Sequence, residues 1–345
     1  MAVETTPSST SVTPQQQVLQ LATGYWLSSV MYAVTALEIP DRLRFGPRSA
    51  TDLAAETGVN ADRLYRVMRA AAMAGVFTEV SPGTFALTPV GDVLRPGVDG
   101  TLHDYVKFVA DPNHMRMFSY MPEMIKTGDM GQYFAFGSRG WEYFERHPDL
   151  SAIFDDAMTN LTKLFGPAMI AAYDFSGIGT LVDVAGGHGA MISMALQRYP
   201  QMRGVILEIP SVVPGARMHL SSIGLGERCT VVAGNYNESV PRGDAIMMKY
   251  IVHSSDDPAA DLLLRNCRKA LENSKVGKLI LFENVVPEGD TPHMAKLLDL
   301  EMMAIPGGRE RTAEQYRTLL DKSGFRMTRV IPTQTPCSVI EAVRA

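Results

Sequence analysis

The sequence has little of what several classes of protein need. Its three cysteines, Cys229, Cys267 and Cys337, are scattered without metal-ligand spacing, so we expect reduced thiols and no metal site. No apolar run approaches the roughly 18 residues that a membrane helix requires, and no secretory signal is recognisable. The net charge of −5 gives no electrostatic reason for binding nucleic acid. These absences favour a cytoplasmic protein without metal, membrane or nucleic-acid partner.

The length and the apolar content predict more than one domain. A chain of 345 residues is too long for one ordinary core, and 46% hydrophobic residues can fill two. We expect a polar, disordered tail at 1–13, a winged-helix-like domain at 14–100, a helical segment at 101–175 and an α/β domain at 176–345.

Residues 49–94 carry the pattern of a winged helix. Ser49 and Asn60 can each cap a helix, and two short β-rich runs flank a Ser-Pro-Gly turn. One interpretation is DNA binding through the second helix, which carries Arg63, Arg66 and Arg69. The other is a packing and dimerisation module with those arginines on a solvated face.

Short β-branched runs alternate with helical stretches from Thr180 onward. This alternation predicts a parallel sheet with helices on both faces. The last two runs are separated only by Thr-Gln-Thr-Pro-Cys, so they should form an antiparallel hairpin at one edge.

A glycine-rich turn, LVDVAGGHGA at 181–190, joins a predicted strand to a helix. Such a turn lets backbone approach a ligand and points helix N–H groups at it. The dinucleotide pattern Gly-x-Gly-x-x-Gly is absent, because Ala185 and Ala190 hold its outer positions. The acidic Asp183 inside the strand end, followed by Gly187 and Gly189, favours a ligand that carries an ammonium and a sulfonium rather than a pyrophosphate.

The next two predicted strands also end on polar residues. The Glu208 carboxylate can accept hydrogen bonds from a ribose diol, Asn235 can reach an adenine edge, and Tyr236 can pack on an adenine face. The alternative is a turn that only packs its helix on the sheet. Three such strand ends together favour a cofactor site at the carboxyl edge of the sheet.

The fourth predicted strand, AIMMKYIV, delivers His253 to that same edge. A lone histidine there is often structural. However, the fifth strand carries Glu283 near its end, and a turn at 307–312 carries Glu310. Carboxylates beside an imidazole orient it and stabilise its protonated form, so we predict His253 as a general base.

From about residue 15 to its end, the chain resembles the S-adenosylmethionine-dependent O-methyltransferases of the plant caffeate and bacterial polyketide type. The resemblance rests on LVDVAGGHG, KYIVHSSDD, LDLEMMAIPGGRERT and CSVIEAVRA. It implies a class I methyltransferase, Rossmann-like α/β fold at 176–345, substrate-pocket helices at 101–175 and a homodimerisation domain at 14–100.

The resemblance also implies roles for individual residues. The cofactor S-adenosyl-L-methionine would be held by Asp183, Gly187, Gly189, Glu208, Asn235, Tyr236 and Lys249. Glu283 and Glu310 would bracket the base His253. Substrate contacts would come from Met158, Met302 and Ile305, with Met117, Phe118 and Trp141 as looser candidates.

Several positions depart from the pattern of that family. Ala185 replaces a usual glycine, Glu208 and Asn235 replace usual aspartates, and Ser254 replaces the acidic residue that commonly follows the base. Glu301 stands where an apolar or amide residue is general. It is either a paired or solvated charge, or a group that recognises a polar or amine-bearing substrate.

The sequence therefore predicts an enzyme that transfers a methyl group to a hydroxyl of a small aromatic substrate. Two alternatives remain open. One is a family member that binds S-adenosylmethionine but catalyses decarboxylation, hydroxylation or a pericyclic reaction. The other is a winged-helix regulator that binds DNA.

Overall fold

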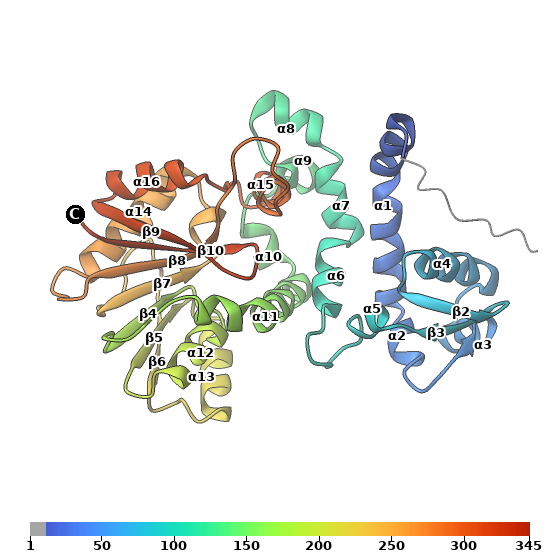
Figure 1. The fold of residues 1–345 in the computed structure, drawn as a ribbon, viewed down its shortest axis with the longest axis horizontal. Helices are drawn as coiled ribbons and strands as arrows, with labels where there is room; N and C mark the ends of the chain where they lie inside the picture. Colours follow the sequence, from blue (N-terminus) through green and yellow to red (C-terminus); the bar gives the residue numbers. More distant parts are fainter. Residues whose placement is uncertain (1–11) are drawn as a thin grey trace, which may run out of the picture. The chain divides into compact units, whose positions relative to one another are not determined.

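A computed structural model describes residues 12–345, and the chain divides after His114 into two compact units (Figure 1). The predicted disordered tail lies outside the described residues except for Val12 and Thr13. The Thr13 side chain accepts a hydrogen bond from the Gln16 N–H and caps the first helix.

The first unit consists of helices around a small sheet. Its elements are α1 (Pro14–Ala36), α2 (Ile39–Arg42), β1 (Arg48–Ser49), α3 (Ala50–Thr57), α4 (Ala61–Met73), β2 (Phe77–Ser81), β3 (Thr84–Leu87), α5 (Pro89–Asp92) and α6 (His103–Val109). Helix α7 (Pro112–Phe118) crosses the boundary.

The winged-helix pattern is present as predicted. Ser49 caps α3, Gly58 ends it in the left-handed conformation, and Asn60 caps α4 by accepting from the Arg63 N–H. The sheet has the order β1-β3-β2. Buried side chains such as Leu53 and Met68 give this unit a hydrophobic core of its own.

The second unit combines a bundle of helices with a larger α/β arrangement. Its elements are α8 (Met121–Thr127), α9 (Gly131–Phe136), α10 (Glu142–Arg146), α11 (Pro148–Ala171), β4 (Thr180–Val184), α12 (Ala190–Arg198), β5 (Arg203–Glu208), α13 (Val213–Ser222), β6 (Cys229–Ala233), β7 (Ala245–Lys249), the 3₁₀ helix η1 (Val252–Ser254), α14 (Asp257–Ala270), β8 (Lys278–Asn284), α15 (Ala295–Ala304), α16 (Ala313–Lys322), β9 (Phe325–Pro332) and β10 (Cys337–Arg344).

The predicted sheet is confirmed. It has seven strands in the order β6-β5-β4-β7-β8-β10-β9. The pairs from β6 to β8 are parallel, and β10 pairs antiparallel with both β8 and β9. The carboxyl ends of the parallel strands β4, β5, β6, β7 and β8 therefore meet at one edge, where their side chains can form a site.

Helices cover both faces of this sheet (Figure 1). Met247 and Ile280 belong to a core with residues of α11, α12 and α13, whereas their neighbours Ile246 and Leu281 belong to a second core with residues of α14 and α16. Successive strand residues thus point to opposite faces, and burial on both sides explains the continuous apolar runs in the sequence.

One strand boundary differs from the prediction. Strand β7 ends at Lys249, so His253 lies in η1 and not at the end of a strand. Tyr250 turns the chain there, with a positive φ of 56° that no extended strand contains. The β-branched residues Ile251 and Val252 suggested a longer strand because their apolar character continues past the turn.

Among residues 12–345, no helix combines the length and the apolar character needed to cross a membrane.

Candidate active site

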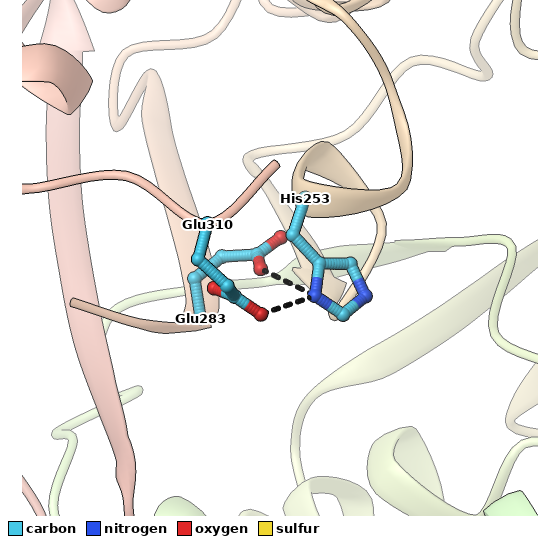
Figure 2. A group of neighbouring side chains, drawn as sticks. All are labelled: His253, Glu283 and Glu310. Carbon is cyan, nitrogen blue, oxygen red and sulfur yellow. Dashed lines mark hydrogen bonds and ion pairs between the residues drawn. The ribbon is translucent and has the colours of Figure 1, made fainter. Parts of the chain in front are cut away.

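The structure brings His253, Glu283 and Glu310 together from three separate segments (Figure 2). Nδ1 of His253 lies 2.8 Å from Oε1 of Glu310 and 4.0 Å from Oε2 of Glu283. All three residues are buried, with exposed fractions of 7%, 0% and 3% for His253, Glu283 and Glu310. The second ring nitrogen, Nε2, points away from both carboxylates (Figure 2).

The local backbone explains how the imidazole is held. Oε1 of Glu283 accepts hydrogen bonds from the N–H groups of Ile251 and Val252, the residues that lead into η1. The Tyr250 ring stacks on the imidazole, with centroids 5.2 Å apart. Ser254 stands where the family commonly has an acidic residue after the base. Its hydroxyl donates a hydrogen bond to the Ile251 carbonyl and closes the turn. Glu283 therefore acts on the backbone of the turn as well as on the ring.

Burial controls the protonation of this cluster. It lowers the pKa of His253, which favours the neutral imidazole. Burial also raises the pKa of Glu283 to about 7 and that of Glu310 to about 8. A neutral imidazole that donates its Nδ1 proton to Glu310 keeps a lone pair on Nε2, which is the form that can accept a proton.

The donor atoms of the three residues all lie within 4.8 Å of one another, a spacing that a metal ion could also use. The 2.8 Å contact between Nδ1 and Oε1 is, however, the length of a hydrogen bond within the cluster. That the enzyme works without a metal stays a prediction.

The glycine-rich turn follows β4 at the same edge of the sheet. Asp183 is 2% exposed, and its Oδ2 atom is buried without a hydrogen-bond partner among the described residues. Burial raises the pKa of this carboxyl to about 8, and the Lys249 charge opposes that shift. A buried carboxylate of this kind is stabilised by a cationic ligand.

The backbone of the turn adopts conformations that let a ligand approach it closely. Gly187 and Gly189 adopt positive φ angles of 56° and 85°, and Ala185 does so at 54°. Oε2 of Glu208 accepts from the Gly187 N–H, so the ends of β4 and β5 are joined by a carboxylate that keeps further lone pairs. These features fit a nucleoside cofactor with a positively charged group near Asp183.

Of the remaining predicted cofactor residues, Asn235 and Tyr236 follow β6 and Lys249 is the last residue of β7. The Asn235 side-chain oxygen accepts from the Asn237 N–H, which leaves its amide N–H groups as the part that can face an adenine. Tyr236 is half-buried. The Lys249 ammonium lies 5.1 Å from the Tyr250 ring centroid, and the charges of Asp183 and Glu283 both act on it.

The predicted substrate residues lie on three helices and in two connections. Phe118 ends α7 beside the buried Met117, Trp141 precedes α10, Met158 lies on α11, and Glu301 and Met302 lie on α15 with Ile305 directly after it. Met302 and Ile305 are buried, and Trp141 is 47% exposed and packs on Phe144 and Phe154. Their contact with a substrate stays a prediction.

Sequence reasoning missed three residues at this site. They are Tyr250, Asn284, which accepts the hydrogen bond of the Tyr250 hydroxyl at 3.1 Å, and the buried Arg311. An arginine directly after the predicted Glu310 was the only available signal, and an arginine in a turn usually indicates a solvated charge.

Comparison with known proteins identifies relatives of this chain. The family model of an O-methyltransferase domain matches residues 118–326, and that of an O-methyltransferase dimerisation domain matches residues 19–96. A phenazine O-methyltransferase, PhzM, from Lysobacter antibioticus is 36% identical over 94% of this chain and 95% of that protein. The phenazine-1-carboxylate N-methyltransferase of Pseudomonas aeruginosa is 32% identical over 96% of this chain and 97% of its own.

Solved structures give the same result. The crystal structure of LaPhzM superimposes with a TM-score of 0.92 at 35% identity, covering 97% of this chain and 100% of that one. Other similar structures contain S-adenosylmethionine or S-adenosylhomocysteine.

The fold and the glycine-rich edge thus define a class I methyltransferase. Within that class, the chain belongs to the S-adenosylmethionine-dependent O-methyltransferase family of enzymes. Its cofactor is S-adenosylmethionine, and Asp183 and the Gly187 turn fit the charge and the shape of that molecule.

Proposed function

We propose that the protein methylates a hydroxyl group of a small aromatic substrate, with His253 as the general base. One observation carries the proposal: Nδ1 of His253 is bound by Glu310 while Nε2 faces away from both carboxylates (Figure 2). S-adenosylmethionine, when bound, supplies an electrophilic methyl group. His253 Nε2 accepts the hydroxyl proton, and Glu310 and Glu283 stabilise the resulting imidazolium.

The cofactor roles follow from the same geometry. Asp183 would hold the cationic amino-acid end, Glu208 the ribose and Asn235 with Tyr236 the adenine, while Gly187 and Gly189 give the backbone close approach. Lys249 would balance the charges of Asp183 and Glu283. Most of the rate acceleration would come from holding the two reacting atoms in line in a dry pocket.

An aromatic substrate is supported by two features. Both relatives described above are named for phenazines, which are fused aromatic rings. The predicted pocket residues Phe118, Met158 and Met302 are also of the kinds that pack on ring faces and edges. The second relative transfers to nitrogen, so amines belong among the test substrates.

We also propose that the protein is a homodimer formed through α1. Residues 19–96 match a dimerisation domain, and α1 exposes Val18, Leu19, Leu21, Tyr25 and Trp26. The DNA-binding alternative is not favoured, because that same match covers the winged helix. A cytoplasmic location stays a prediction of the sequence.

The test of the proposed function is His253→Ala in the full chain. The purified enzyme is incubated with methyl-labelled S-adenosylmethionine and a panel of hydroxyphenazines, hydroxybenzoates and the matching amines. We expect kcat to fall by about 10²–10⁴-fold while S-adenosylhomocysteine affinity, measured by calorimetry, stays nearly unchanged.

The matched control is His103→Ala, which removes another buried histidine whose Nδ1 lies 2.9 Å from a carboxylate, that of Asp104. It should affect stability without a comparable loss of kcat. Full activity of His253→Ala would remove the base assignment. Turnover without formation of S-adenosylhomocysteine would instead favour the non-methyl-transfer alternative.

A further inference from the structure

Arg311 is a buried cation in the residue directly after Glu310. Its side chain is 1% exposed, and its guanidinium nevertheless has partners on every nitrogen. Nε and Nη2 donate to Oδ1 of Asp257 at 3.0 and 2.7 Å. Nη1 donates to the Val252 carbonyl and Nη2 to the Ser255 carbonyl, both at 3.0 Å. A guanidinium taken out of water is tolerated only when it is paired in this way.

These contacts enclose His253. Val252 precedes the histidine and Ser255 follows it by two residues, so the guanidinium bridges both ends of the turn that carries the base. The Arg309 N–H donates to the His253 carbonyl at 2.8 Å. At Gly308 an added Cβ atom would lie 2.1 Å from that carbonyl, so the two backbones approach as closely as glycine allows.

The backbone of Arg311 is also held, by the two residues that follow β8. The Val286 N–H donates to the Arg311 carbonyl at 3.0 Å, and Val285 forms a parallel bridge with Arg311. The segment 308–311 is therefore anchored to the continuation of β8, the strand that carries Glu283. Two consecutive residues of this segment contact the turn of the base. The Glu310 carboxylate binds Nδ1 of His253, and the Arg311 guanidinium binds the carbonyls of Val252 and Ser255.

We infer that Arg311 is a positioning residue of the methyl transfer: by joining Val252, Ser255 and Asp257, it holds the turn of His253 so that Nε2 keeps its direction. The inference rests on the proposed role of His253. Lysine could not replace it, because a single ammonium cannot reproduce the planar fork of five N–H donors.

Arg311 also acts through its charge. The groups that face His253 are Glu283 on β8, Lys249 on β7, Tyr250 before η1 and the pair Glu310 and Arg311, and Asp299 on α15 faces Glu310. Among them, the Arg311 charge lowers the pKa of Glu283 and of Glu310 against the effect of their burial. It thereby favours the ionised carboxylate that accepts the Nδ1 proton.

The experiment compares Arg311→Lys and Arg311→Gln in the full enzyme with a matched control. Arg228→Lys is that control, because Arg228 Nη2 also joins three carbonyls, those of Leu196, Tyr199 and Met202, away from the site. We expect Arg311→Lys to lower kcat by about 10–100-fold, with the affinity for S-adenosylhomocysteine unchanged. In addition, Arg311→Gln should move the rising limb of the profile of kcat against pH to higher pH, by about half a pH unit or more.

Asp257→Asn tests the inference if neither Arg311 variant folds. Its carboxylate is half-exposed, so the change is tolerated more easily, and it removes the charge but keeps an acceptor. We expect kcat to fall by about 3–10-fold. Losses no larger than in Arg228→Lys, with an unchanged pH profile, would overturn the positioning role. If His253→Ala also kept full activity, the proposed function itself would fail, whereas an inactive His253→Ala would confine the failure to Arg311.

Discussion

Tyr250 shows how one residue sets the direction of the candidate base. Its φ of 56° is uncommon for a bulky residue, and its surroundings hold it there. The N–H donates to the Phe282 carbonyl at 2.9 Å and the hydroxyl to Asn284. Both partners lie on β8, next to Glu283. The strain of the turn is thus balanced by contacts with the same strand that supplies a carboxylate to the cluster.

Ala185 carries strain of the same kind in the cofactor turn, since its φ is 54°. We expect Ala185→Gly to raise the free energy of unfolding by about 0.5–1 kcal/mol, because glycine adopts this conformation without steric cost. Urea unfolding followed by fluorescence measures the change, and calorimetry with S-adenosylhomocysteine should show nearly unchanged affinity.

The opposite substitution is Gly189→Ala in the same turn. There φ is 85°, and an added Cβ atom would lie 2.6 Å from Cδ1 of Ile206. It should destabilise the fold by about 1–2 kcal/mol and weaken cofactor binding. Equal stabilities for the two variants and the parent would show that backbone strain does not matter at this turn.

At the scale of elements, the site depends on η1, β8 and the 307–312 turn meeting at one edge of the sheet. The proposed mechanism needs an ionised Glu310 to accept the Nδ1 hydrogen bond, and burial raises the pKa of that carboxyl to about 8. We therefore expect kcat/KM to increase with pH through about 7–8 and to level off above. Initial rates between pH 6 and 9.5 at subsaturating acceptor measure it.

The stability of the fold should change in the opposite direction. The folded-state pKa values of Glu283 and Glu310, about 7 and about 8, lie above the ordinary value of 4.5. Their contribution to stability is therefore complete below pH 4.5 and is lost as the pH rises through 7 and 8.

The variant Glu310→Gln tests which group causes the increase of kcat/KM with pH. Its activity should be low, and its kcat/KM should increase less with pH than that of the parent enzyme. An unchanged profile in that variant would assign the titration to another group.

The pattern of elements could be predicted because each follows from local rules. Strands buried on both faces appear as apolar runs, and helices begin at capping residues such as Ser49, Asn60 and Thr312. Glu283 and Glu310 could be associated with His253 because strand ends and adjoining turns share one edge of a parallel sheet.

The details of the turn could not be predicted. The left-handed conformation of Tyr250 has no local signal, since neither glycine nor asparagine occupies that position. The burial of Arg311 depends on carbonyls of Val252 and Ser255, which are far away in the sequence. Such contacts are tertiary, and only the folded chain reveals them.

At the scale of the whole molecule, the chain joins a unit suited to association with a unit that holds the candidate site. The first unit has one hydrophobic core and the second has two, and all residues with proposed catalytic or cofactor roles belong to residues 115–345. Helix α1 contrasts with the other long helix, α11, because most of its apolar side chains are exposed. An apolar surface of this kind indicates a partner, which we propose to be a second copy.

Leu21→Asp tests this association. Leu21 is 76% exposed on α1, and a carboxylate there should be buried without a partner in a dimer. We expect sedimentation equilibrium to show a monomer where the parent chain is a dimer. Met218→Asp on α13, where the side chain is 72% exposed, is the control and should stay dimeric. A monomeric parent chain, or a dimeric Leu21→Asp, would contradict the proposal.

The position of β10 has a consequence for synthesis of the chain. Within residues 12–345, strand β9 pairs with β10 alone, and β10 lies between β9 and β8 although it comes after both in the sequence. While the ribosome still holds residues 337–344, β8 has no strand paired on that side, so the backbone N–H and C=O groups along one side of this apolar strand stay open. A nascent chain should therefore need chaperone protection until β10 has been made and has paired with β8.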